Sequence, residues 1–208
     1  MTAMLDVKGL EKVYRRGGPL SRTVGFRLEA DFAVQNAGIV GMMGPNGSGK
    51  TTLFELITGS NAPTGGQVLI GGRDIHKVRT DERDRLAIHY HQSYQVRHFR
   101  ALTPNLLLQR AGCDYPRVHL FDEPQFNTQD GYIGFMLDFF RKLRNDGRLV
   151  FLCVHPNERL HLEILEEACD SFIFVQQGSV TALPDYQALL RHGPVRAYLG
   201  DLLEGRAA

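Results

Sequence analysis

The sequence has few cysteines, no tryptophan and no long apolar run. The three cysteines, Cys113, Cys153 and Cys169, show no paired spacing. A disulfide framework and a zinc site are therefore not expected, and a reducing compartment is the simpler interpretation. No stretch approaches the roughly 18 apolar residues that a membrane-spanning helix needs, and the first residues do not resemble a signal peptide. We expect a cytoplasmic chain without direct membrane insertion.

An excess of charge of either sign is also lacking, since 24 basic and 23 acidic residues give a net charge of +1. This balance excludes a general electrostatic attraction to nucleic acid, so no nucleic-acid partner is expected. The length of 208 residues and the hydrophobic fraction of 43% are typical of one globular domain. At this size roughly 70% of the surface of the unfolded chain can be buried.

Short apolar runs alternate with helical patterns along the chain, which predicts an α/β fold. Strands are expected at 5–10, 26–34, 38–43, 68–70, 87–91, 118–121, 149–154, 172–175 and 180–182. Helices are expected at 50–58, 104–111, 131–144, within 158–168, and around 184–190 and 195–203. In the strand at 87–91, His89 and His91 alternate on one face, which we interpret as a solvated face and not a metal pair.

A glycine-rich turn joins the strand at 38–43 to the helix at 50–58 and fits the pattern G-x-x-x-x-G-K-[ST] in full. Its residues are Gly44, Pro45, Asn46, Gly47, Ser48, Gly49, Lys50 and Thr51, followed by Thr52. Glycines let successive backbone N–H groups surround a phosphate, and the helix N-terminus adds partial positive charge. Lys50 would reach the β- and γ-phosphates, and the Thr51 hydroxyl would hold Mg²⁺.

Two adjacent carboxylates end the buried strand at 118–121 and precede Pro124. Asp122 can complete the coordination of Mg²⁺. Glu123, one residue further, can polarise a water for attack on the γ-phosphate. Taken alone, this is also a plausible strand-end turn, but after an intact phosphate loop it predicts a second part of the same site.

With these motifs, the chain resembles the ATP-binding-cassette (ABC) ATPases over almost its whole length. The resemblance assigns Tyr14 to the position that stacks on adenine, and Gln92 to the position that senses Mg²⁺ and the attacking water. It assigns His155 to the switch position that contacts the γ-phosphate. The sequence at 66–72 resembles a hairpin of the family's antiparallel lobe, and 167–178 resembles its final strand pair.

The resemblance implies one P-loop NTPase domain over 1–208, with a mainly parallel sheet flanked by helices. A small antiparallel lobe would take about 1–35 and 66–91, and a truncated helical region about 93–116. The tail at 195–200 is similar to the branch that contains branched-chain amino-acid importers and the lipopolysaccharide-transport ATPase. Its Tyr198 and Leu199 could equally be ordinary helix-packing residues.

The sequence departs from the family between Gln92 and Asp122, where no Ser-Gly-Gly occurs. Thr-Gly-Gly-Gln at 64–67 imitates the family's signature motif, but it precedes Gln92 and is interpreted as a turn. The signature and most of the helical subdomain are therefore missing. Asp130 is the candidate for the aspartate that reaches across the family's dimer, although its spacing is one residue too long.

Members of the family dimerise head to tail, and each ATP is enclosed between the phosphate loop of one chain and the signature motif of the other. The resemblance therefore implies a Mg²⁺-ATP-binding transporter subunit with membrane-spanning partners and a second, signature-bearing cassette, peripheral on the inner face of the membrane. A cassette that binds ATP without significant hydrolysis is the alternative. A soluble ABC ATPase of DNA repair or translation, and a P-loop kinase, are less favoured because long insertions, fused cassettes and an acceptor-binding lid are not apparent in the sequence.

Overall fold

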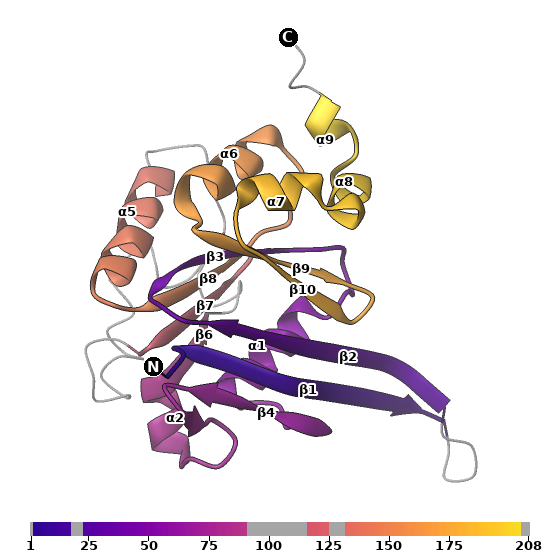
Figure 1. Ribbon diagram of the computed structural model, residues 1–208, viewed down its shortest axis with the longest axis vertical. Coiled ribbons are helices and arrows are strands. Elements are labelled where there is room, and N and C mark those ends of the chain that lie inside the picture. Colours follow the sequence, from indigo (N-terminus) through magenta and orange to yellow (C-terminus); the bar gives the residue numbers. More distant parts are fainter. Residues whose placement is uncertain (1, 18–22, 91–115, 125–131, 205–208) are drawn as a thin grey trace.

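The computed structural model describes residues 2–17, 23–90, 116–124 and 132–204. In this part of the chain, strands form one sheet in the order β5-β4-β1-β2-β10-β9-β3-β8-β7-β6 (Figure 1). The strands are β1 (Leu5–Arg16), β2 (Thr23–Val34), β3 (Gly38–Met43), β4 (Gly65–Ile70), β5 (Arg73–Asp74), β6 (Ala87–Tyr90), β7 (Val118–Asp122), β8 (Leu149–Cys153), β9 (Ser171–Gln176) and β10 (Ser179–Leu183). The helices are α1 (Lys50–Thr58), α2 (Thr80–Leu86), α5 (Tyr132–Asn145), α6 (Arg159–Ala168), α7 (Tyr186–Arg191), α8 (Gly193–Leu199) and α9 (Asp201–Glu204).

The parallel part of the sheet is built around β3, which pairs in parallel with both β8 and β9. On the far side of β8, β7 and then β6 continue the parallel arrangement. Every residue of β3, β7 and β8 is buried. Parallel strands with helices on both faces have no solvated side, which explains their continuous apolar sequences. The predicted α/β fold with a mainly parallel sheet is confirmed.

The antiparallel part comprises β1, β2, β4 and β5. β1 and β2 are longer than the sequence predicted, because their outer halves alternate only weakly and project toward solvent. The range 66–91, expected for antiparallel elements, includes β6, which pairs in parallel with β7. A four-residue strand does not reveal its partner by periodicity, so this boundary could not be read from the sequence.

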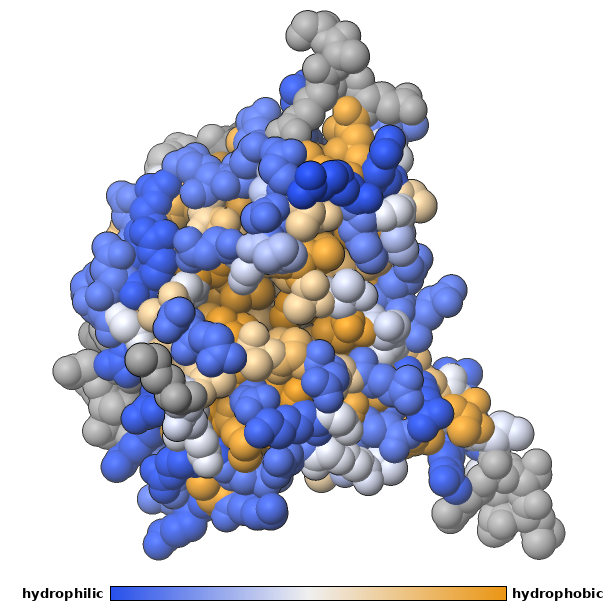
Figure 2. All heavy atoms as spheres, in the orientation of Figure 1, coloured by the Kyte–Doolittle hydropathy of each residue, from blue (hydrophilic) through white to orange (hydrophobic). Residues whose placement is uncertain are grey.

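Two hydrophobic clusters fill the two sides of the sheet. Helix α1 packs Leu53, Phe54 and Ile57 into the first cluster, together with side chains of the antiparallel strands. Helices α5 to α8 cover the other side, where Phe140 of α5 is completely buried. Figure 2 shows hydrophobic side chains gathered in the middle of the face drawn, with hydrophilic side chains around them.

Several short elements differ from the sequence predictions. Helix α2 was not expected, because its sequence is almost entirely charged and buries only Leu86. The C-terminal region forms three short helices and not two, since Gly200, with a φ of 47°, ends α8 before α9 begins. The helix expected at 104–111 lies outside the described residues. Among the helices of the described ranges, none has the length and apolar character that crossing a bilayer requires.

Candidate phosphate-binding site

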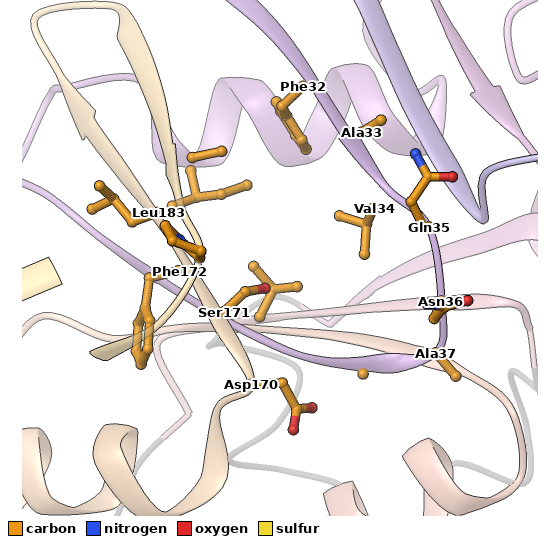
Figure 3. Close-up of a pocket in the computed structure, with 15 residues that line it drawn as sticks. Phe32, Ala33, Val34, Gln35, Asn36, Ala37, Asp170, Ser171, Phe172 and Leu183 are labelled. Atoms are coloured by element: carbon orange, nitrogen blue, oxygen red, sulfur yellow. The ribbon is translucent and has the colours of Figure 1, made fainter. Parts of the chain in front are cut away.

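Two pockets at opposite ends of the central strand can be compared. A pocket of about 510 Å³ opens at the amino-terminal end of β3, where β2 separates from β10 after a single paired position (Figure 3). Its lining includes Phe32, Phe172 and Leu183. Asp170 is the charged residue of this lining, and its carboxylate already accepts a hydrogen bond from the backbone N–H of Ile39 at 2.8 Å. The larger pocket is therefore not the candidate site, because its lining is mostly apolar and its charged residue is already hydrogen-bonded.

The second pocket, of about 260 Å³, lies at the carboxyl end of β3. Residues of the predicted phosphate loop and α1, together with Phe26 of β2 and Glu123 after β7, line it. Ligands of open α/β sheets bind at the carboxyl ends of the strands. The smaller pocket is therefore the candidate site, since it brings together a lysine, hydroxyls and a carboxylate.

The loop between β3 and α1 is held in place by the β9–β10 hairpin. At the tip of this hairpin the backbone N–H of Gly178 donates to the carbonyl of Ser48 at 3.0 Å. The φ of Gly44 is 153°, and a Cβ on this residue would lie 2.0 Å from the carbonyl oxygen of Val175. The turn at Gln177-Gly178 has positive φ at both residues, as type I′ turns require. A strand far along the chain thus supports the phosphate loop.

Helix α1 begins directly after Gly49, and within the described part of the chain no side-chain hydrogen bond caps its start. The N–H groups at a helix start have no intrahelical acceptor and carry partial positive charge, so they favour an anion. Lys50, only 6% exposed, donates to the carbonyl oxygens of Gly44 at 2.8 Å and Pro45 at 3.0 Å. An ammonium group has three hydrogens, so a further bond to a phosphate oxygen can be added.

Thr51 and Asp122, 71 positions apart in the sequence, meet at this site. The hydroxyl of Thr51 donates to Oδ2 of Asp122 at 3.1 Å, and Nε2 of His89 lies 3.3 Å from the same oxygen. Burial alone would raise the pKa of Asp122, but the hydrogen bond and charge of His89, with the Thr51 hydroxyl and the Cys153 thiol, lower the pKa overall. The carboxylate is therefore held in its charged form.

The interpretation of His89 as part of a solvated face is wrong. Its side chain is only 13% exposed, because α1 covers this face of β6, and the Phe54 ring packs edge-on against the imidazole at 5.4 Å. The alternation of a short strand shows which residues share a face, but not which helix covers it. His91 lies outside the described residues.

Glu123 has an unusual backbone conformation, with a φ of 49°. Its backbone N–H donates to the carbonyl of Cys153 at 3.0 Å, which fixes the turn after β7. Glu123 lines the pocket together with Lys50 and Thr51. Non-glycine residues with positive φ are uncommon and often occur at functional sites.

His155 follows β8 at the same edge of the sheet. Its Nδ1 lies 2.9 Å from the hydroxyl of Tyr198 in α8. β8 pairs Cys153 with Asp122 and with Met42, so His155 follows a strand that lies between β3 and β7. The structure therefore places His155 next to the Asp122 strand end, although it is not part of the lining of the 260 Å³ pocket.

Tyr14 lies beside this pocket without lining it. Its hydroxyl accepts a hydrogen bond from the Asn61 amide at 2.7 Å, and its ring lies 6.3 Å from that of Phe26. Phe26 does line the pocket, and its ring would come within 2.9 Å of a Cβ on Gly49. Phe26 is not among the site residues predicted from the sequence. The signal that could have found it is its alternation with Leu28 along β2, which places both side chains on the face of α1.

The remaining predicted residues cannot be placed. Gln92, Asp130 and Cys113 lie outside the described residues, as does the region at 93–115. Among the described residues, no cluster of three or more histidine, cysteine or carboxylate side chains suits a metal ion. Mg²⁺ that is bound together with phosphates usually takes only one or two protein carboxylates.

The residues present fit both a phosphate and Mg²⁺. The buried Ser48 hydroxyl has no hydrogen-bond partner among the described residues, which leaves an unsatisfied polar atom in the loop. The Thr51 hydroxyl and the charged Asp122 carboxylate are adjacent oxygen ligands of the kind that Mg²⁺ prefers. The uncapped start of α1 and the Lys50 ammonium offer donors to an anion. A parallel sheet with this loop and this helix defines the P-loop NTPase class.

Comparisons with known proteins agree with this class. A family model described as ABC transporter matches residues 28–105. The chain is similar in structure to a nucleotide-free ATP-binding cassette from an ABC transporter, with a TM-score of 0.68 and 16% identity, over 95% of this chain and 98% of that one. It is also similar to an ABC transporter cassette in its ADP conformation, with a TM-score of 0.66 and 15% identity, over the same shares. The fold is therefore that of an ATP-binding cassette.

Sequence relatives carry corresponding names. The lipoprotein-releasing system ATP-binding protein LolD 1 of Rhodopseudomonas palustris is 24% identical, over 86% of this chain and 99% of that protein. The cytochrome c biogenesis ATP-binding export protein CcmA of Alkalilimnicola ehrlichii is 39% identical, over 42% of this chain and 34% of that protein. The phosphonates import ATP-binding protein PhnC of Chromohalobacter salexigens is 33% identical, over 52% of this chain and 39% of that protein. The last two matches thus span less than half the length of those relatives.

Proposed function

We propose that the chain is the ATP-binding and ATP-hydrolysing subunit of an ABC transporter. The observation that carries this proposal is one pocket lined by the phosphate loop, Lys50, Thr51 and Glu123, with Asp122 hydrogen-bonded to Thr51 behind it. The family model that matches residues 28–105, and relatives named as ATP-binding proteins of import, export and lipoprotein release, support it.

In this proposal the loop binds the phosphates of ATP through its backbone N–H groups and the start of α1. Lys50 binds the β- and γ-phosphates, and the Thr51 hydroxyl, the Asp122 carboxylate and Gln92 hold Mg²⁺. When bound, Mg²⁺ supplies positive charge that stabilises the charge developing on the phosphates. Phe26 and Tyr14 form an aromatic edge beside the loop on which a nucleotide base can stack.

For hydrolysis, the Glu123 carboxylate accepts a proton from the attacking water and so raises its nucleophilicity. Glu123, at the turn after β7, lines the same pocket as Lys50, which supports this role. His155 donates a hydrogen bond to the γ-phosphate from the neighbouring strand end. Together these groups supply a general base for the water and a hydrogen-bond donor to the γ-phosphate.

The proposed partners are membrane-spanning transporter subunits and a second cassette that carries the signature motif. The reason is the sequence between Gln92 and Asp122, which contains no Ser-Gly-Gly. The signature motif of a partner cassette could cover the ATP that is bound at Lys50. The heteromer would then contain one composite site that can hydrolyse ATP. The chain would then lie on the inner face of the membrane through its partners.

The missing signature also favours a second candidate function, a cassette that binds ATP structurally or as a regulator without significant hydrolysis. Both candidates require ATP binding at Lys50. They differ in whether Glu123 has a chemical task, because a binding module needs no general base.

The first experiment measures equilibrium binding of Mg²⁺-ATP to the purified chain and to the Lys50→Ala and Lys77→Ala variants. Loss of a charge-assisted bond to phosphate should weaken binding by at least about tenfold in Lys50→Ala. Lys77 is 79% exposed and far from the loop in sequence, so Lys77→Ala should bind like the parent. Equal affinity in all three proteins would contradict ATP binding at this site.

The second experiment isolates the tagged chain with its partners from detergent-solubilised native membranes and measures ATP turnover. Glu123→Gln should reduce turnover by about a hundredfold or more while ATP binding persists. Unchanged turnover would show that Glu123 is not the base. Absence of turnover in the parent complex would favour the binding module, and recovery of the chain without membrane-spanning partners would contradict the transporter assignment.

A further inference from the structure

A tyrosine from the C-terminal helices is hydrogen-bonded to the histidine that follows β8. The hydroxyl of Tyr198 lies 2.9 Å from Nδ1 of His155, and their ring centroids are 6.1 Å apart. The two residues are 43 positions apart, and Tyr198 belongs to α8, beyond the last strand (Figure 1). From the sequence alone, Tyr198 could equally be an ordinary packing residue, and this contact gives it a specific polar partner.

The position of Tyr198 is fixed by the packing of α8. Val195 is completely buried and Leu199 is 4% exposed, so both anchor the helix in the second hydrophobic cluster. The Tyr198 ring packs against Phe174 of β9 at 5.8 Å. Because the helix and the ring are both held by buried contacts, the hydroxyl has a defined location beside His155.

The hydrogen bond has a chemical consequence for the imidazole. A neutral imidazole has one N–H donor and one acceptor nitrogen, and the partner of one nitrogen sets the role of the other. Burial, followed by the charges of Cys153 and Glu123, raises the pKa of Tyr198 to about 12, so the hydroxyl keeps its proton at neutral pH. A hydroxyl that donates to Nδ1 leaves the proton of the neutral ring on Nε2.

We propose that Tyr198 is a positioning residue that holds His155 with its Nε2–H available as a donor to the terminal phosphate of the nucleotide. The inference rests on the proposed function of the same site. It assigns Tyr198 a role through His155 and not through its own contact with nucleotide. Helix α8 thereby links the C-terminal part of the chain to recognition of the γ-phosphate.

The first test reads the tautomer directly, by ¹⁵N NMR of the histidine side chains in the nucleotide-free chain at neutral pH. The His155→Gln variant identifies the His155 signals. In the parent, Nδ1 of His155 should show the shift of a hydrogen-bonded acceptor and Nε2 that of a protonated nitrogen. Tyr198→Phe, which keeps the ring against Phe174, should move the Nδ1 signal. Unchanged signals, or a proton on Nδ1 in the parent, would overturn the proposal.

The second test measures recognition of the γ-phosphate as the ratio of affinities for Mg²⁺-ATPγS and Mg²⁺-ADP. Tyr198→Phe should lower this ratio by roughly three- to tenfold, the size expected for one weakened hydrogen bond, with ADP affinity unchanged. Tyr186→Phe in α7 is the matched control, since its ring packs on Phe172 of β9. This control should keep the parent's ratio.

A double variant separates action through His155 from a general effect on the fold. If Tyr198 acts through His155, His155→Gln/Tyr198→Phe should have the same affinity ratio as His155→Gln alone. Additive losses would overturn the positioning role. If the parent binds neither nucleotide, the proposed function fails and the phosphate role with it. If the parent binds both and Tyr198→Phe keeps its NMR signals and its ratio, only the role of Tyr198 fails.

Discussion

Replacing Gly44 by alanine should disturb the phosphate loop far more than the same change at Gly47. Both glycines have positive φ, of 153° and 75° respectively, so alanine strains the backbone at either position. The surroundings differ, since a Cβ on Gly44 would lie 2.0 Å from the carbonyl oxygen of Val175, whereas a Cβ on Gly47 meets no atom of the described residues within 4 Å. The pair therefore separates backbone strain from steric overlap within one loop.

The magnitudes follow from these two terms. Strain of a non-glycine residue at positive φ costs about 1–2 kcal/mol, which is the full expected loss for Gly47→Ala. Overlap with a backbone atom cannot be relieved by a side-chain rotation, and overpacking adds about 1–3 kcal/mol. Gly44→Ala should therefore lower the free energy of unfolding by about 2–5 kcal/mol. The β9–β10 hairpin would have to move away from the loop.

The assay is urea denaturation of the parent and the two variants, followed by far-ultraviolet circular dichroism, with the midpoint and slope compared. Mg²⁺-ATP binding to each variant is measured under the same conditions. Gly44→Ala should show the larger shift in midpoint and the larger loss of affinity. An equal loss of stability in the two variants would refute the argument that the hairpin fixes the loop at Gly44.

Three further predictions concern other parts of the site and the core. His89→Leu should lower the free energy of unfolding by about 1–3 kcal/mol, because the buried Asp122 carboxylate loses a hydrogen-bond donor. Urea denaturation measures this loss, and an unchanged midpoint would contradict the prediction. Burial lowers the pKa of His119 to about 3, so between pH 6.5 and 3 the unfolded chain binds a proton that the folded chain does not. The free energy of unfolding should therefore fall as the pH is lowered from 6.5 to 3, by up to about 1.4 kcal/mol per pH unit. His119→Gln should flatten this dependence, and parallel curves for the parent and the variant would refute the argument. Phe26→Ala should weaken ATP binding about three- to tenfold and more than Tyr14→Ala, as measured by calorimetry, because Phe26 lines the pocket; the reverse order would restore Tyr14 as the main aromatic contact.

The elements that carry the phosphate site were predictable because their signals are local. The run of glycines before Lys50 requires particular backbone angles, and the continuous apolar sequence of β3 is typical of a strand buried on both faces. The strand that ends in Asp122 was recognised for the same reason. These patterns extend over fewer than ten residues, so they can be recognised in the sequence without knowledge of the tertiary structure.

Elements with weak local patterns were predicted less well. Helix α2 has seven residues and buries one, so it has no apolar periodicity to detect. The strand β6 was expected, but its parallel pairing with β7 was not, and its boundary with the antiparallel part was misplaced. The solvated-face interpretation of His89 failed because the covering helix, α1, comes from a segment more than 30 positions earlier.

The sequence by itself determined the phosphate loop, the carboxylates that end β7 and the α/β class, because backbone geometry and burial pattern are written in adjacent residues. Only the tertiary structure decided that Thr51 and His89 both contact one oxygen of Asp122. It also decided that Phe26, and not the neighbouring Tyr14, lines the pocket, and that Tyr198 is hydrogen-bonded to His155. These contacts join residues from 12 to 71 positions apart. They depend on strand order and helix packing, which arise from the whole hydrophobic core and leave no periodic signal in any one segment.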